Sequence, residues 1–160
     1  MNFTKQVSIN ASADKVWDVL GRDFANMGVW ATPVTHSVAN NEIAKVNNSP
    51  VGGRVCETSV GKISEEFIAY DDEKKTYSFR GVFDSKMFKS VISSAEVISV
   101  NENTAIAKIT PDIKLSFIGT LMFPIIKMQL SKLIDQILDD LKYYVENGKP
   151  SPRKLASQQK

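Results

Sequence analysis

A carboxylate that must face the protein core is the first feature of this sequence that could do chemistry. Residues 62–70 alternate like a strand, and their core-facing apolar members are Ile63, Phe67 and Ala69. The same alternation turns Glu65 inward. A buried carboxylate is costly unless it is paired or hydrogen-bonded. Glu65 therefore needs a partner, and it could act as a proton carrier or as a polar anchor for a ligand.

The preceding stretch offers a cation to Glu65. A turn at Val60-Gly61 would place Cys56 opposite Glu65. Arg54 would then lie opposite Phe67, as a diagonal neighbour of Glu65 within reach of a long side chain. Two interpretations stay open: a polar anchor inside an otherwise apolar ligand pocket, or an ion pair at the end of a sheet with no ligand.

The chain has one histidine and one cysteine, His36 and Cys56, which excludes an internal disulfide, four-cysteine zinc sites and multi-histidine metal sites. His36 could be an acid or base near neutral pH, but no nucleophile with a local motif accompanies it, which favours a solvated strand histidine. Cys56 is most simply a small buried hydrophobe. Nucleophile-elbow, zinc-protease, dinucleotide and phosphate-loop motifs are all missing. We expect no metal and no cofactor.

The remaining candidates would form the wall of a binding site. Gln129 interrupts an apolar stripe between Ile125 and Leu133, where it could hydrogen-bond a ligand or lie at the edge of the stripe and meet water. Methionines and aromatic residues suit adaptable walls, although core packing is their commoner role. The candidates for ligand contact are Trp30, Arg54, Cys56, Glu65, Phe67, Tyr77, Phe79, Phe88, Met122, Ile126 and Gln129, and the catalytic candidates are Glu65 and His36.

Alternating and helical patterns predict the elements that hold these residues. A strand over residues 3–10 precedes a helix that Ser12 caps and Gly21 ends, and a second short helix covers residues 24–30. Strand-like stretches separated by turn residues then follow at 34–46, 54–60, 62–70, 76–83, 88–100 and 104–115. They predict an antiparallel meander.

A long amphipathic helix completes the chain. Apolar residues recur at three- and four-residue spacing from Ile118 to Tyr144, and Gly148 ends the pattern. From Pro124 to Asn147 such a helix is about 36 Å long, whereas a domain of this size has a radius of gyration near 15 Å. The helix must therefore cross the whole body, and a curved sheet must wrap around it.

Composition and charge limit the class of protein. The 160 residues are 42% hydrophobic and 24% charged, as in an ordinary single globular domain. Residues 1–147 form the expected domain, and residues 148–160, with two prolines and no acids, are expected to be a flexible basic tail. Without the four cations of that tail, residues 1–147 have a formal charge of −2, so the surface of the domain is expected to lack the basic excess that nucleic-acid or anionic-membrane binding would need. No signal peptide or membrane-spanning run is present, and a cytoplasmic protein, monomeric or weakly dimeric, is expected.

The order of these elements resembles the START-like (SRPBCC) superfamily, which includes polyketide cyclase/dehydrase-like proteins, lipid-transport domains and pollen-allergen relatives. The matching segments are residues 7–9, 13–17, 23–26 with Trp30, 51–55, 65–72 and 76–79. The resemblance implies an α+β helix-grip fold: a curved antiparallel sheet of about seven strands around a long C-terminal helix, with two short helices after the first strand. Cyclase-like relatives commonly have an arginine where this chain has Cys56, and Arg54 is the candidate substitute.

The resemblance also implies a function. The leading hypothesis is binding of a hydrophobic or amphipathic small molecule, such as a lipid or polyketide, in a cavity between sheet and helix, for transport, storage or sensing. The alternative is a polyketide cyclase/dehydrase-like enzyme that uses Glu65 or His36 as proton carrier. A third reading is a protein-interaction domain whose helix and groove meet a protein partner.

Overall fold

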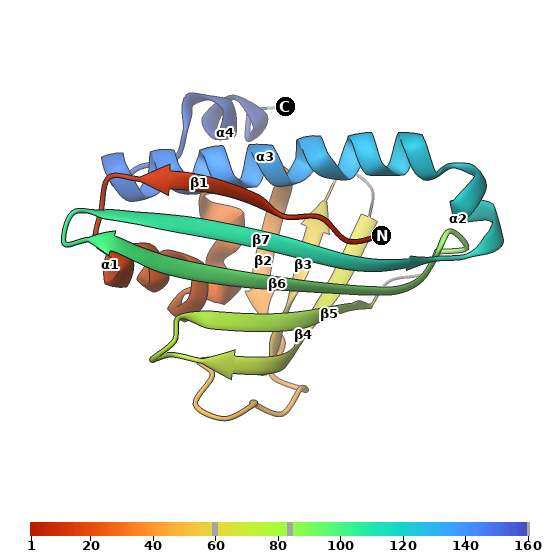
Figure 1. Ribbon diagram of the computed structural model, residues 1–160, viewed down its shortest axis with the longest axis horizontal. Helices are drawn as coiled ribbons and strands as arrows, with labels where there is room; N and C mark the ends of the chain where they lie inside the picture. Colours follow the sequence, from red (N-terminus) through yellow and green to blue (C-terminus); the bar gives the residue numbers. More distant parts are fainter. Residues whose placement is uncertain (59–60, 83–84, 160) are drawn as a thin grey trace.

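A computed structural model describes residues 1–58, 61–82 and 85–159. Its centre is a seven-stranded antiparallel sheet with the strand order β1-β7-β6-β5-β4-β3-β2, and the helix α3 lies across it (Figure 1). The strands are β1 (Lys5–Ile9), β2 (Val34–Ala39), β3 (Gly53–Thr58), β4 (Gly61–Asp71), β5 (Thr76–Val82), β6 (Phe88–Asn101) and β7 (Thr104–Leu115). The predicted α+β helix-grip fold is confirmed.

The first short helix after β1 begins at its predicted cap, Ser12, but ends at Trp17 rather than at Gly21. α1 (Ala13–Trp17) begins at Ser12, whose Oγ accepts a hydrogen bond from the Lys15 N–H at 3.3 Å. The chain continues through a π-helical turn, η1 (Asp18–Arg22), and a 3₁₀ segment, η2 (Phe24–Val29). Together they close one end of the sheet.

The long helix is preceded by a short one. α2 (Phe117–Leu121) is capped by Ser116, and α3 (Phe123–Asn147) has 25 residues with proline in its first turn, where its missing N–H costs nothing. The inward face of α3 buries Ile126, Ile134, Leu138, Leu141 and Val145. Gly148 ends α3 with a φ of 67°, and its N–H donates to the Tyr144 carbonyl at 2.8 Å.

Two strand predictions need correction. The stretch expected as strand over 34–46 ends at Ala39, and a loop carries the chain from there to β3. In β4 a bulge separates the pairs Phe67 with Phe79 and Ala69 with Ser78. The extra residue reverses the alternation, so Tyr70 is buried and Ala69, predicted to face the core, is exposed.

The end of the chain differs from the predicted flexible tail. Ser151 caps a further helix, α4 (Pro152–Ser157), and its Oγ also donates to Asp140 Oδ1 at 2.7 Å. Lys154 is fully buried, and its Nζ donates to the Val34 carbonyl at 2.6 Å. The polar composition of residues 148–160 did not indicate an ordered helix, because Ser151 and Lys154 bind another side chain and the backbone rather than water. Among the described residues no helix is both long and apolar enough to cross a membrane.

Candidate functional site

Arg54 and Glu65 form an ion pair on the inner face of the sheet. The β3–β4 register places them directly opposite each other and places Cys56 opposite Ile63, so the pair is closer than the predicted diagonal contact. Arg54 Nε donates to Glu65 Oε2 at 2.5 Å. The predicted turn at Val60-Gly61, on which the expected register depended, lies partly outside the described residues.

The surroundings of Arg54 hold its charge in the core. The Phe24 ring lies 3.8 Å below the guanidinium carbon, and Nη1 donates to the Phe24 carbonyl at 2.7 Å. Burial by itself would lower the pKa of Arg54, but the facing Glu65 carboxylate raises it above its usual value. Arg54 is therefore a permanent buried cation whose partner is one carboxylate.

An aromatic cluster seals one side of this pair. The Phe24 ring lies 4.2 Å from that of Phe67 and 5.3 Å from that of Tyr77, measured between ring centroids, and Phe79 continues the cluster. Burial raises the pKa of the Tyr77 phenol well above its usual value. These predicted site residues are brought together, and most of them are core.

The opposite side of the pair is more open. The Glu65 side chain is 15% exposed, compared with 5% for Arg54. Ile63, Phe79 and, from α3, Leu130 face inward but are only half-buried. Small inward residues, Gly81 on β5 and Ser93 on β6, lie beside Phe79 on this face. Glu65 is thus the polar group that a molecule lying along this apolar face would meet.

His36 and Cys56 do not form a pair. Cys56 is buried and contacts Ser37, with 3.5 Å between Sγ and Oγ, and burial raises the pKa of its thiol. His36 is exposed on β2 and lies opposite Glu57 in the strand register. Because the two side chains belong to opposite faces of the sheet, no cysteine-histidine chemistry follows from this arrangement.

The other predicted contact residues are dispersed. Trp30 is buried, and its Nε1 has no hydrogen-bond partner among the described residues. Phe88 on β6 is half-buried, and Ile126 on α3 is buried. Met122 and Gln129 are exposed, the latter on α3. The geometry therefore joins Arg54, Cys56, Glu65, Phe67, Tyr77 and Phe79 in one region and leaves the remainder outside it.

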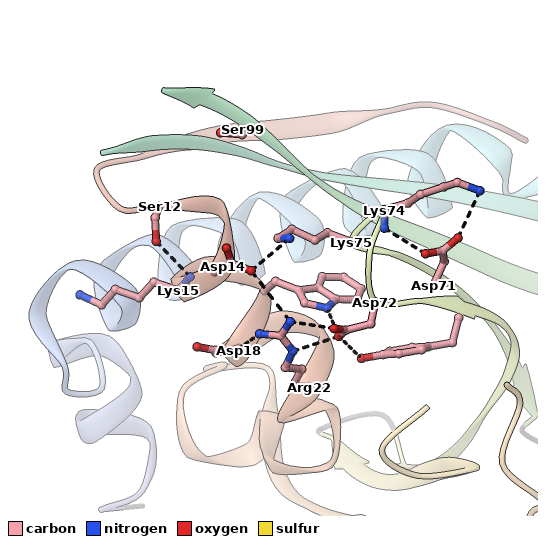
Figure 2. A network of polar contacts seen from close by, with 12 residues as sticks. Ser12, Asp14, Lys15, Asp18, Arg22, Asp71, Asp72, Lys74, Lys75 and Ser99 are labelled. Atoms are coloured by element: carbon pink, nitrogen blue, oxygen red, sulfur yellow. Dashed lines mark hydrogen bonds and ion pairs between the residues drawn. The ribbon is translucent and has the colours of Figure 1, made fainter. Parts of the chain in front are cut away.

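A second polar cluster was missed by sequence reasoning. Asp72, in the turn between β4 and β5, accepts hydrogen bonds from Trp17 Nε1 at 2.8 Å, from Tyr70 at 3.1 Å and from two nitrogens of Arg22 (Figure 2). These bonds, chiefly those from Arg22, hold the pKa of Asp72 far below its usual range. Burial, reinforced by Asp72, raises the pKa of Tyr70 to about 12.

No local motif could have indicated this cluster. Its members come from α1, η1, the end of β4 and the β4–β5 turn, and the four-residue spacing of Asp18 and Arg22 was the one local signal in the sequence. The nearby Asp14 and Lys75 also pair, at 3.1 Å, at a hollow of about 470 Å³ on the outer surface. Asp14, Asp18, Asp72, Arg22 and Lys75 each have an opposite charge beside them, so these side chains join elements of the fold and offer little to a ligand.

Comparison with known proteins shows what the whole chain is similar to. A family model described as "Polyketide cyclase / dehydrase and lipid transport" matches residues 1–146. No curated protein matches the chain.

Three solved structures show the same fold at low identity. The Zhui aromatase/cyclase from Streptomyces sp. R1128 is 13% identical, with a TM-score of 0.69 over 94% of this chain and 99% of that chain. A START superfamily protein from Mycobacterium smegmatis is 11% identical, with a TM-score of 0.60 over 88% and 98% of the two chains. Norcoclaurine synthase from Thalictrum flavum is 12% identical, with a TM-score of 0.63 over 91% and 93%. At these identities the likeness concerns the fold.

Proposed function

The chain belongs to the polyketide cyclase/dehydrase and lipid-transport family, and from that premise we propose that it binds a hydrophobic or amphipathic small molecule between the inner face of its sheet and α3. The observation that carries the proposal is the Arg54–Glu65 pair, set in an otherwise apolar face with Glu65 partly exposed. Ligand sites of this kind combine apolar walls with a few polar groups that fix orientation.

The apolar part of the ligand lies, in this proposal, along Ile63, Phe79 and Leu130. These side chains face inward but are only half-buried, so a bound ligand would cover apolar surface that is now exposed to water. Gly81 and Ser93, which carry little or no side chain, lie beside Phe79 on the same face of the sheet. A hydroxyl of the ligand would donate a hydrogen bond to Glu65, whose position Arg54 fixes.

Extraction of the purified protein with organic solvent, followed by mass spectrometry, tests the proposal directly. A co-purified apolar molecule is expected, and Ser93→Phe should remove it, because the new ring would lie beside Phe79 where the ligand is proposed to bind. Ile92→Phe is the matched control, because Ile92 lies on the outer face of β6. Retention of the same molecule by Ser93→Phe, with the fold intact by circular dichroism, would contradict this binding site.

An enzyme of cyclase or dehydrase type is the second candidate, and the fold likeness to an aromatase/cyclase favours it. Glu65 would be the proton carrier, since His36 lies on the outer face of β2, away from the apolar inner face. Glu65→Gln separates the two functions. Unchanged ligand affinity with turnover reduced by about 100-fold or more supports an enzyme, whereas an equal loss of both supports a polar anchor.

A further inference from the structure

The end of the molecule formed by α2 and the start of α3 exposes large apolar side chains. We call residues 85–89 and 114–133 the α2 tip; α2 lies at one extreme of the long axis (Figure 1). Phe117 is 79% exposed and Leu121 is 70% exposed. Their exposed apolar neighbours are Ile118, Met122, Ile125 and Met128. Contiguous apolar surface of this kind marks an interaction site.

The charges around this apolar surface have one sign. The charged residues of the α2 tip are Lys86, Lys89, Lys114, Lys127 and Lys132, and all of them are exposed. Three acids lie within two residues of this segment in the sequence: Asp84, which is outside the described residues, Asp112, and Asp135, which pairs with Lys5. Even if all three are included, an excess of two positive charges remains. In the described part of the chain no carboxylate pairs with these lysines.

This local excess changes what the overall charge implied. The outward side of α3 carries Ile125, Met128 and Lys132 in its first half but Asp135 and Asp139 in its second half. The formal charge of −2 for residues 1–147 is therefore the sum of a basic α2 tip and an acidic remainder of the domain. The expectation that an anionic surface would not attract this domain holds for the average and not for the α2 tip.

The α2 tip is a folded surface rather than a loose loop. Ser116 donates its N–H to the Met87 carbonyl at 2.9 Å and its hydroxyl to the Lys86 carbonyl at 2.7 Å. Its hydroxyl oxygen accepts from the Gly119 N–H at 3.1 Å. Gly119 packs so closely on the Met87 carbonyl that a side chain there would clash. These contacts hold α2 against the start of β6 and turn Phe117 and Leu121 to the outside.

We propose that the α2 tip docks on the surface of an anionic lipid bilayer. Phe117 and Leu121 enter the interface, and the surrounding lysines contact the phosphate and carboxylate groups of the lipid heads. The charge of the α2 tip favours an anionic bilayer over a second copy of the chain as the partner, because two α2 tips that face each other would bring their lysines together. The proposal is independent of the ligand proposed above, since it rests on outward-facing residues.

Flotation with lipid vesicles tests the docking. The full chain should bind vesicles of phosphatidylcholine containing about one third phosphatidylglycerol, and bind pure phosphatidylcholine weakly. The double variant Phe117→Ser, Leu121→Ser should weaken vesicle binding by about 100-fold, because each lost apolar side chain contributes about tenfold. Lys127→Glu with Lys132→Glu should weaken it by at least about fivefold for each lysine. Phe117→Trp should move its fluorescence emission to shorter wavelength on the anionic vesicles, because the native Trp17 and Trp30 are buried.

Matched variants keep the test specific. Val38→Ser with Val100→Ser removes exposed apolar residues elsewhere, and Lys15→Glu with Lys149→Glu reverses exposed lysines elsewhere; both should bind as the unchanged chain does. No binding to anionic vesicles, equal binding to neutral ones, or equal loss in the control variants would overturn the proposal. So would a dimer in sedimentation that the Phe117→Ser and Leu121→Ser variant abolishes while vesicle binding is retained.

Discussion

The two ends of α3 lie in opposite surroundings. Its second half is covered by β1 and the short helices, and it buries Leu138, Leu141 and Val145. Its first half, with α2, leaves Ile125 and Met128 exposed and buries Ile126. At the covered end nearby charges are paired, as in Arg22 with Asp18 and Asp72, whereas the lysines of the α2 tip lack acidic partners in the described chain. We infer that the covered end holds the fold together and that the open end is available for binding.

Two leucine substitutions, one at each end, should differ most in their effect on the free energy of unfolding. Leu141→Ala, at a fully buried position, should lower the free energy of unfolding by about 3 kcal/mol, because it removes packed methyl groups and leaves a cavity. Leu121→Ala, at a position 70% exposed, should change it by less than about 0.5 kcal/mol. Urea unfolding measures both, and equal losses would contradict the distinction.

Removal of residues 150–160 should have the next largest effect. Asp140 is fully buried and accepts hydrogen bonds from Ser151 at 2.7 Å, from Arg153 at 2.9 Å and from the Thr32 N–H at 2.7 Å. Loss of the first two donors leaves the carboxylate undersatisfied, at a cost of about 2 kcal/mol. Thermal unfolding of the shortened chain is the measurement, and Gln158→Ala, at an exposed position, is the control. An unchanged melting temperature would mean that α4 does not belong to the covered end.

The smallest effect concerns pH. The depressed pKa of Asp72 makes its bonds to Arg22 and Trp17 stabilising above about pH 4, the ordinary range of a carboxyl, and this stability is lost as the pH falls through the lower pKa of the folded protein. Asp72→Asn should cost on the order of 1 kcal/mol at neutral pH, a figure discounted for the partial exposure of Asp72. Its difference from the unchanged chain should shrink below about pH 4.

Urea unfolding at several pH values checks this, with Glu102→Gln in the exposed β6–β7 turn as the control. A difference that stays constant down to strongly acidic pH would show that Asp72 does not act through its charge.

The architecture could be predicted because the spacing of apolar residues within each helix or strand shows which of its faces is buried. The sequence also predicted that Glu65 turns inward and that Arg54 is near it. It failed at Ala69 because a single bulge reverses the faces of a strand. It failed at Asp72 and Lys154 because their partners, Trp17 and Val34, are distant in the chain. The exposure of the α2 tip escaped it as well, since an apolar run in a sequence does not show which side remains uncovered.

The pairing of β1 with β7 has a consequence for how the chain folds. Lys5 lies opposite Ile109 and Ile9 opposite Ala105, so the first strand pairs with one made about a hundred residues later. At synthesis rates of about 5–20 residues per second, β1 waits roughly 5–20 s for its neighbour. Pairings this distant slow folding, because the loop between them must close first. The β3–β7 meander, whose strands are joined in order, is therefore expected to form before β1 and α3 close over it.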